Sequence, residues 1–505
     1  MQRGLSLVGT GGVSMRADQL SSRLDASMVM MDGILHRSIN PDMHCRRLRV
    51  FRREAAVYFV EGIVSSEFLQ HYLLAYLLHY EDEAMQGDIA DELQGKIPIL
   101  EATVEARAGA AASQMMKGRA AVLVDGMPCA VCFDILSFVR RSISPPLTES
   151  VVNGPHQGFN ESIRDNITLL RRILPTPELI GEMTPVGDRY PTNLCILYLQ
   201  GTVDEMLLQR LKNRLQSLRV DHVLSIGALE QLIEDAPYAL LPQCCLTERP
   251  DRAASFLLEG QILLALDGSP QLLCVPVSIL HLLHTPDDTS LRWQYGTFLR
   301  LIRLMGVVTT LLLPGLFVAA VAFHPELLPV TLLTAILESQ AAVPLSIPME
   351  MLLMLLMFNL IGEASTRVPG VVGSSLGTVS GLILGQAAVE AKLVHPLLII
   401  VVAVASLGSY AIPDHSLSIA CRIAQLLFLA VASIFGLYGM VLLLGAGIVR
   451  MCSLRSLGSP YAAPIAPVRL HNPDVFLRYP IWHQSLRGWL ADPRSLVRRQ
   501  DRRKR

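Results

Sequence analysis

Three polar side chains stand at intervals of four residues in an otherwise apolar stretch of the chain. Asn359, Glu363 and Arg367 fall within about 80° of one another on a helix, so they share one face. Glu363 precedes Arg367 in the favourable order for an ion pair within a helix. Ionisable residues at membrane depth usually face a bundle interior or a water-filled cavity. The pattern predicts either a polar lining or an internal ion pair that holds the helices together.

A glycine repeat follows at once. Gly373, Gly377, Gly381 and Gly385 recur every four residues and form a stripe along one helix face. Such faces let neighbouring helix backbones approach closely, so we expect a packing face within the subunit or between subunits. The segment Gly373-Ser-Ser-Leu-Gly377 also matches the G-x-S-x-G pattern of hydrolases. That motif requires a strand, a turn and a helix, whereas this stretch is a membrane helix, so a nucleophile is not favoured.

Two further clusters have spacings known from redox and metal sites. Cys129-Ala-Val-Cys132 has thioredoxin spacing but lies in a probable strand, so core cysteines are favoured. His281-Leu-Leu-His284, with Asp287 and Asp288, has a possible metal spacing but no identifiable third ligand, so a surface helix end is favoured. No nucleophile, base and metal set can be assembled, and the sequence predicts no enzyme, no cofactor and no metal site.

The polar and glycine positions belong to a long apolar region, residues 304–449. Its first piece, Leu304–Phe323, has 20 residues and no charge, about what a helix needs to cross a hydrocarbon core of roughly 30 Å. The uncharged run between Arg422 and Arg450 has 27 residues, enough for a tilted span. Two more strong spans are expected at Val371–Ala391 and Leu393–Pro413. These features predict an integral membrane protein.

Two weaker segments leave the number of spans open. Leu327–Ile347 is broken by prolines and suits a re-entrant piece or a short span, and Met349–Thr366 is a helix candidate. Arg300 and Arg303 before the first span, and the basic tail after Arg450, predict that both chain ends are cytoplasmic. The number of crossings is then even: four, or six if both weaker segments cross. The tail arginines could also contact anionic lipid headgroups.

Composition agrees with a chain divided between water and membrane. The 505 residues are 51% hydrophobic and only 17% charged, against about 25% charged in soluble domains. The formal net charge of −1 gives no indication of a nucleic-acid partner. The nine scattered cysteines fit a reducing compartment better than a disulfide scaffold. The first 20 residues lack the apolar core of a cleavable signal peptide.

The soluble half carries an internal duplication. An apolar strand that ends at glycine and precedes a helix occurs at Ala56–Gly62 and again at Leu194–Gly201. An Asp-Gly pair that follows a β-rich run occurs in Gly118–Gly126 and again in Gly260–Gly268. The two offsets, 201 − 62 = 139 and 267 − 125 = 142, nearly agree, so we expect two similar α/β subdomains. Each Asp-Gly predicts a tight hairpin rather than a phosphate-binding turn.

The duplicated halves are joined by a loop rich in proline and glycine, Pro145–Phe159, and a helical run, Asn160–Ile173. The run carries Arg164, Arg171 and Arg172, so an anion site at the helix start is one interpretation. A capped helix that packs one subdomain on the other is the favoured one, because no phosphate-loop lysine is present.

These patterns predict an α/β cytoplasmic region of two similar subdomains, an α-helical polytopic membrane domain and a basic cytoplasmic tail. The expected boundaries are a loosely ordered extension at 1–40, subdomains at 41–140 and 186–295 with a linker at 141–185, the membrane domain at 296–450 and the tail at 451–505.

Several stretches together resemble the A-subunit family of bacterial spore germination receptors, the GerA family. The resemblance runs in order from about Arg46 to Pro480, and Asn359 departs from it because the family pattern has glutamate there. The stretches that carry it are Glu149–Ile163, Asn166–Arg172, Glu248–Asp251, Leu266–Pro270, His324–Glu326, Glu363–Ala364, Arg367–Pro369, Gly385–Ala388 and Leu454–Tyr461.

The resemblance implies a protein of the inner membrane of the spore, working with a transporter-like B subunit that binds nutrient and a lipoprotein C subunit. It also implies a homo-oligomer that passes ions when a germinant is sensed. A related member of the same family that acts in ion release from the spore is the first alternative. A solute transporter is the second, although transporters place their sites on broken helices in two related membrane halves, and no second half is found here.

Overall fold

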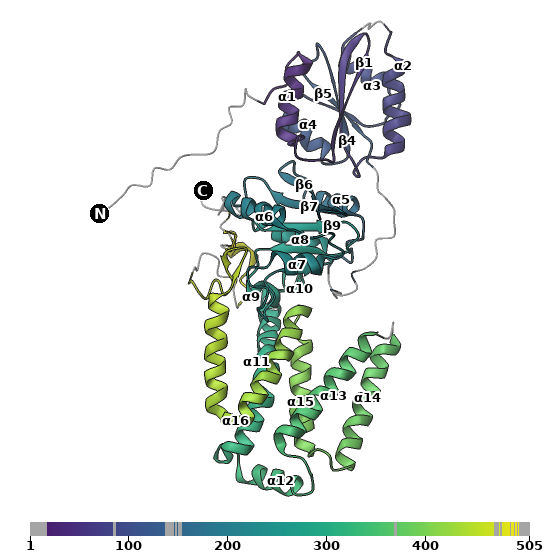
Figure 1. Cartoon of the computed structure of the whole chain (residues 1–505). Helices are drawn as coiled ribbons and strands as arrows, with labels where there is room; N and C mark the ends of the chain where they lie inside the picture. Colours follow the sequence, from purple (N-terminus) through teal and green to yellow (C-terminus); the bar gives the residue numbers. More distant parts are fainter. Residues whose placement is uncertain are drawn as a thin grey trace, which may run out of the picture. The chain divides into compact units, whose positions relative to one another are not determined.

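The computed structural model describes residues 18–83, 87–136, 154–367 and 371–468, together with residues 146, 149, 474, 477–484, 486–488, 490, 491 and 493. The chain divides into two compact units. The first comprises residues 1–233, 246–275 and 491–496, and the second comprises residues 234–245, 276–490 and 497–505. The two five-stranded sheets lie essentially in the first unit, and the long helices lie in the second (Figure 1).

The first sheet has five antiparallel strands in the order β1-β2-β4-β5-β3. Alternate residues face opposite sides, so Val57 and Phe133 pack on one face while Ala56 and Cys132 pack on the other. Helices cover both faces (Figure 1). The strands are β1 Met43–Val50, β2 Arg53–Val60, β3 Ala102–Glu105, β4 Arg119–Val124 and β5 Ala130–Asp134. The helices are α1 Leu24–Leu35 and α4 Ala108–Met115 on one face, and η1 Phe68–Leu74, α2 Ala75–His79 and α3 Ile89–Lys96 on the other.

The second sheet repeats the first. Its order, β6-β7-β9-β10-β8, is the first order with each number raised by five. This identity confirms the duplication that the sequence offsets predict. The strands are β6 Leu179–Val186, β7 Thr192–Leu199, β8 Cys245–Thr247, β9 Ile262–Leu266 and β10 Leu272–Val275. The helices are α5 Ile163–Ile173, α6 Glu205–Ser217, α7 Ile226–Ile233 and α8 Pro250–Leu258.

Both Asp-Gly pairs form the predicted hairpins. β4 pairs antiparallel with β5 across Asp125-Gly126, and β9 pairs antiparallel with β10 across Asp267-Gly268. Gly126 and Gly268 have φ angles of +89° and +83°, a region that glycine enters without steric penalty.

Helix α1 differs from the loosely ordered extension expected for residues 1–40. Leu24, Met28, Met31 and Leu35 recur at helical spacing, and all four are buried in the core of the first sheet. The helix is therefore part of the first subdomain. Residues 1–17 lie outside the described part of the chain.

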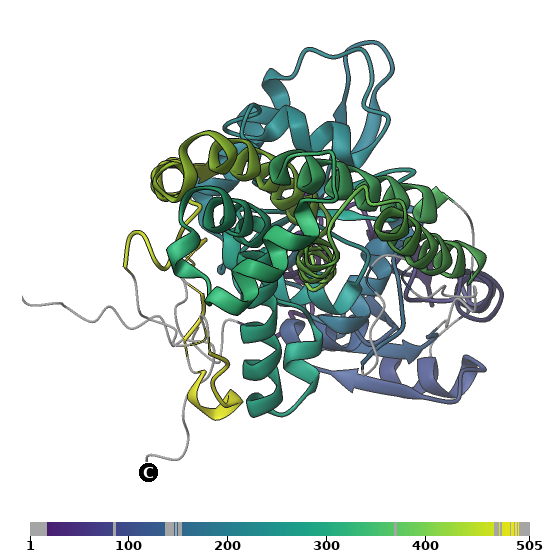
Figure 2. The same ribbon diagram turned by 90° about the horizontal axis from the view of Figure 1, so that it is seen from below.

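The second unit holds the membrane helices (Figures 1 and 2). Among the described residues, three helices are long and apolar enough to cross a membrane, namely α11, α13 and α16, and two apolar stretches in α14 and α15 are shorter. The chain is thus a membrane protein, and α13, one of the weaker segments by sequence, ranks among the three. The helices are α9 Ile279–Leu283, α10 Asp287–Ser290, α11 Trp293–Phe323, α12 Val330–Gln340, α13 Ile347–Arg367, α14 Val371–Glu390, α15 Pro396–Tyr410 and α16 His415–Ser453.

The uncharged run in α16 is not one straight helix. Gly436 has φ 60° and ψ −146°, which breaks the helical path. A Cβ built on Gly439 would lie 3.3 Å from the carbonyl oxygen of Val431, a residue two turns away in a straight helix. The chain therefore turns sharply at Gly436 and forms two arms. The number of membrane crossings and the side on which each terminus lies stay predictions.

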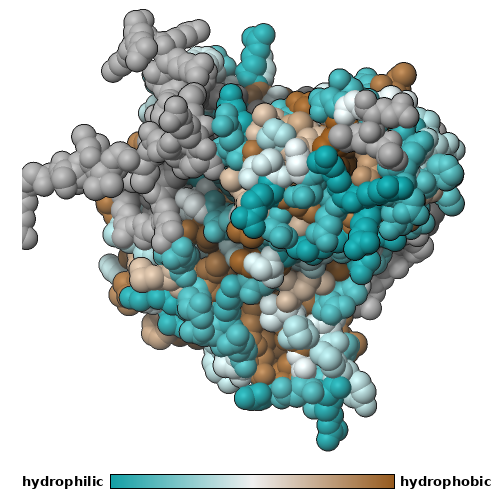
Figure 3. Space-filling model, turned by 90° about the horizontal axis from the view of Figure 1, so that it is seen from above, coloured by the Kyte–Doolittle hydropathy of each residue, from teal (hydrophilic) through white to brown (hydrophobic). Residues whose placement is uncertain are grey.

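A region that is in contact with water is expected to have a polar surface. Figure 3 shows one face of the molecule coloured by hydropathy. In that view, the described surface is mostly hydrophilic, with smaller apolar areas between the polar side chains.

Candidate functional site

Helix α13 is packed against the other helices at its start, and one of the polar residues predicted from sequence is exposed on it. Met351, Met354 and Leu355 of this helix are buried in the apolar core of the helical region. Asn359 is half-buried and Glu363 is exposed. The side chain of Arg367 lies outside the described residues. Of the three residues, Glu363 is therefore the one that the described part of the chain leaves exposed.

Arg422, which the sequence does not place near α13, lies close to Gly362 of this helix. A Cβ built on Gly362 of α13 would be 3.8 Å from an Arg422 guanidinium nitrogen and 3.7 Å from the Tyr410 hydroxyl. The Arg422 guanidinium stacks over the Tyr410 ring at 5.5 Å. In the sequence, Arg422 only marks the end of an uncharged run, and nothing in its spacing indicates α13 as its neighbour.

The glycine stripe on α14 is divided by the structure. Gly385 is buried, and a Cβ there would contact Ile399 of α15 at 4.0 Å, whereas a Cβ on Gly381 would meet nothing within 4 Å. The surroundings of Gly373 and Gly377 lie outside the described residues. The role of the glycine stripe as a packing face stays a prediction. At Gly381, the single chain leaves space that a neighbouring molecule could occupy.

A close approach of two helix backbones at glycine is found between α11 and α15. A Cβ on Gly306 of α11 would be 2.8 Å from the carbonyl oxygen of Gly408 on α15. Thr310 next to it donates a hydrogen bond to the carbonyl of Ala405 at 3.0 Å. The two glycines are far apart in sequence and belong to no repeat, so the sequence gives no signal for their contact.

The histidine and aspartate cluster at 281–288 is not a metal site among the described residues. His281 contacts the Ser278 hydroxyl at 2.8 Å and completes the capping of α9. Asp288 is buried and turns instead toward the start of α11. Its carboxylate accepts hydrogen bonds from Arg300 at 3.2 Å and from Arg303 at 2.8 Å.

This buried network also ties down the C-terminal segment. Arg300 donates to Asp474 at 2.7 Å, and Arg478 donates to the carbonyl of Leu291 at 2.7 Å. The two arginines that mark the membrane border in the sequence are thus held by carboxylates rather than left to lipid headgroups. The network fixes the start of α11, the first membrane helix, to the chain on either side of it.

Two of the stretches that carry the family resemblance meet in the first unit. The Glu149 carboxylate accepts hydrogen bonds from the Thr247 hydroxyl at 2.7 Å and from the Glu248 backbone N–H at 3.0 Å, and it pairs with Arg252. Arg249 is buried and bonds to Asp251 at 2.7 Å. The arrangement anchors Glu149 of the interdomain loop on the second subdomain.

Helix α5 is a connector rather than an anion site. Ser162 caps its start by accepting from the Asp165 N–H. Arg171 is buried and pairs with Asp42, next to β1, and it also donates to the carbonyl of Leu179 at 3.1 Å. Arg164 bonds to Glu61 at 2.8 Å. These arginines are engaged by carboxylates of the first subdomain, which supports the favoured interpretation of the run.

The cysteine pair has the electrostatics of core thiols. Burial raises the pKa of Cys132 to about 12 and also raises the pKa of Cys129. Redox-active Cys-x-x-Cys motifs depend on a lowered thiol pKa, so the opposite shift disfavours that chemistry. All nine cysteines are free thiols.

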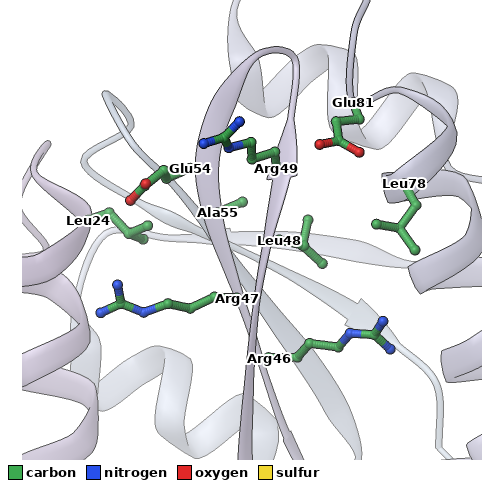
Figure 4. Close-up of a pocket in the computed structure, with 9 residues that line it drawn as sticks. All are labelled: Leu24, Arg46, Arg47, Leu48, Arg49, Glu54, Ala55, Leu78 and Glu81. Carbon is green, nitrogen blue, oxygen red and sulfur yellow. The ribbon is translucent and has the colours of Figure 1, made fainter.

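A cavity of about 400 Å³ opens beside the edge strand β1 (Figure 4). Arg46, Arg47 and Arg49 line it together with Glu54 and Glu81. Arg47 bonds to Asp25 at 3.3 Å. The mixture of charges suits a polar solute, and nothing in the lining resembles a catalytic set.

Comparisons with known proteins identify the family of the chain. The model of the GerA family, Bacillus/Clostridium spore germination proteins, matches residues 30–488. The chain is 33% identical over 446 residues to spore germination protein KA of Bacillus subtilis, covering 88% of this chain and 82% of that protein. It is also 33% identical to spore germination protein GerLA of Bacillus cereus, covering 84% and 87%.

A solved structure, the N-terminal domain of the A subunit of the Bacillus megaterium spore germinant receptor GerK3, is 26% identical. It covers 51% of this chain and 95% of its own, with a TM-score of 0.41. The family model alone spans most of the sequence. The chain belongs to the Bacillus/Clostridium GerA spore germination protein family.

Proposed function

We propose that this A subunit assembles into a homo-oligomer through the outer side of α13 and α14, and that the assembled face provides an ion path. The observation that carries the proposal is Glu363, a carboxylate exposed on a helix that is long and apolar enough to span a membrane. An ionisable group in such a helix is costly against lipid and is usually covered by protein or water. Since the described part of this chain leaves it exposed, another copy or a water-filled path would cover it.

The neighbouring residues support an interface at this place. Leu360 on α13 is 65% exposed, and Leu382 and Ile383 on α14 are 63% and 60% exposed. Gly381 adds a position where another helix backbone could approach closely. Asn359 and Arg422 would then contribute polar groups beside Glu363.

The proposed role is to pass a germinant signal to this assembly. The cytoplasmic subdomains would be coupled to gating through α11, whose first turns are held by the Asp288 network. As an A subunit, the chain would work with B and C subunits, the B subunit binding the nutrient, in the inner membrane of the spore with both termini cytoplasmic. A role in later ion release is the alternative within the same family.

Ion leakage from proteoliposomes tests the conduction half of the proposal. The purified chain would be reconstituted alone and with its B and C partners, as wild type, as Glu363→Gln and as Glu338→Gln. Glu338 is the matched control, an exposed carboxylate on the neighbouring α12. Flux that falls severalfold in Glu363→Gln but not in Glu338→Gln supports the ion path. No flux in any combination, with the oligomer intact, would indicate a scaffold, and flux of a nutrient solute would indicate a transporter.

A further inference from the structure

A carboxylate and an imidazole are buried together inside the apolar core of the helical region. Glu350, in the first turn of α13, is 0% exposed, and His395, the residue that caps α15, is 1% exposed. Glu350 Oε2 lies 2.8 Å from His395 Nδ1 and accepts the His395 backbone N–H at 3.1 Å. The two residues lie 45 positions apart and join α13 to α15.

The remaining polar atom of each side chain has no partner. Glu350 Oε1 and His395 Nε2 are both buried without a hydrogen bond among the described residues. Buried polar atoms are nearly always satisfied, so two orphaned atoms on one contacting pair call for a physical explanation. A bound proton gives a physical reason, because it makes the pair neutral, and a neutral polar group costs less to bury without a partner than an ion does.

In the described part of the chain, no other charged side chain is bonded to the pair. The core around the pair consists of apolar side chains from α11, α12, α14, α15 and α16, among them Val318, Ile336, Ala388, Leu398 and Leu429. The Phe317 ring stacks on the imidazole with 5.8 Å between centroids. The charged residues closest in sequence on adjoining elements, Glu338, Glu390 and Lys392, are exposed. Within the described residues, the pair therefore has to balance its own charge.

Counting protons defines the possible states. The backbone N–H can only donate, so Oε2 acts as an acceptor, and the ring donates from Nδ1. With no further proton, the pair is an ionised carboxylate beside a neutral imidazole and carries one negative charge. One more proton, on Oε1 or on Nε2, makes the pair neutral overall. In an apolar core, the neutral state is favoured because an uncompensated buried charge is costly.

We propose that Glu350 and His395 form a proton-binding site that holds one proton while α13 is packed on α15. The ligand is the proton itself, shared between a carboxylate and an imidazole. Removing it leaves a net negative charge in the apolar core and weakens the packing between the two helices. The protonated state therefore stabilises the packed helices at lower pH, and this stabilisation is lost as the pH rises and the proton is released.

Thermal unfolding of the full chain in lipid nanodiscs, followed from about pH 5 to pH 9, tests the site. The variants are Glu350→Gln, which keeps the shape and cannot ionise, and Glu338→Gln, the same change at an exposed carboxylate. We expect the wild-type midpoint to fall by on the order of 5 °C as the pH rises. Glu350→Gln should lack this fall, and Glu338→Gln should retain it.

A second measurement covers the case in which Glu350→Gln does not fold. Infrared difference spectra of the wild type, acidic minus alkaline, should contain one titrating carboxylic acid or imidazolium signal that His395→Asn removes. Asparagine can still donate to Oε2, so this variant preserves the contact between α13 and α15. Equal pH dependence in wild type and Glu350→Gln would overturn the proposal, as would spectra unchanged by His395→Asn. A midpoint that depends on Na⁺ or K⁺ at constant pH, and not on pH, would also overturn it by identifying a metal cation as the ligand.

Discussion

Asp288 is the residue on which the start of the first membrane helix depends. Its side chain is 1% exposed and receives hydrogen bonds from both Arg300 and Arg303. Breaking a buried ion pair by removing one partner leaves the other charges uncompensated, which typically costs about 3–5 kcal/mol. The sequence shows these residues only as an acidic helix end and as two arginines before a span. Their meeting depends on the turn between α10 and α11, which no spacing rule specifies.

Replacing Asp288 by asparagine should therefore destabilise the helical unit. We expect Asp288→Asn to lower the free energy of unfolding by about 3 kcal/mol or more, measured as a loss of thermal stability of the purified protein. Asp221→Asn is the matched control, because Asp221 is 75% exposed and lies 4.0 Å from Arg189. Exposed pairs contribute about 0–1 kcal/mol, so the control should change little. Equal effects of the two variants would contradict the buried network.

The cysteines allow a second prediction at this scale. A raised pKa lowers the thiolate fraction at any given pH, and only the thiolate reacts with alkylating agents. Because burial raises the pKa of Cys132 to about 12, its thiol should stay almost unmodified near pH 8 in the native protein. Cys452 is exposed and should be alkylated first. Mass spectrometry of iodoacetamide-treated protein distinguishes the two, and rapid labelling of Cys132 would favour a reactive Cys-x-x-Cys site.

Among the elements, the contact between α11 and α15 leaves little space for a larger side chain. Gly445 on α16 has nothing within 4 Å of a built Cβ, whereas Gly306 would meet Gly408 at 2.8 Å. Glycine to alanine within a helix is favourable by roughly 0.5–1 kcal/mol where space allows. We expect Gly306→Ala to lower the free energy of unfolding by about 1–3 kcal/mol through overpacking, and Gly445→Ala to be neutral or stabilising. Thermal unfolding of both variants measures the difference, and a stabilised Gly306→Ala would show that the two helices pack less closely.

Some features of the helices and strands could be predicted from the sequence, and others could not. The two Asp-Gly hairpins and the duplicated strand order follow from local turn chemistry and from offsets along the chain, so they could be predicted. The break at Gly436 could not, because it lies in an apolar run that also contains Gly439, Gly445 and Gly447. Gly436 is distinguished by its backbone angles and by the close approach of Phe323, and neither can be read from its neighbours in the sequence.

For the whole molecule, hydropathy and repetition determine the organisation, while contacts between distant residues determine the candidate sites. The soluble sheets and the apolar helices were predictable because burial against water and against lipid leave different patterns in sequence. Glu363 was identified by its helical spacing. Arg422 near α13 and the buried pair Glu350–His395 were not, since each joins helices that are far apart in the chain.

In the assembled receptor, we expect another copy of the chain to cover the exposed residues of α13 and α14. Native mass spectrometry of the purified protein in nanodiscs tests it with wild type, Gly381→Leu and Gly445→Leu. Both glycines have open surroundings in the single chain, so neither leucine should disturb its fold. We expect a homo-oligomer for wild type and Gly445→Leu and a monomer for Gly381→Leu. A monomeric wild type, or an intact Gly381→Leu oligomer, would contradict it.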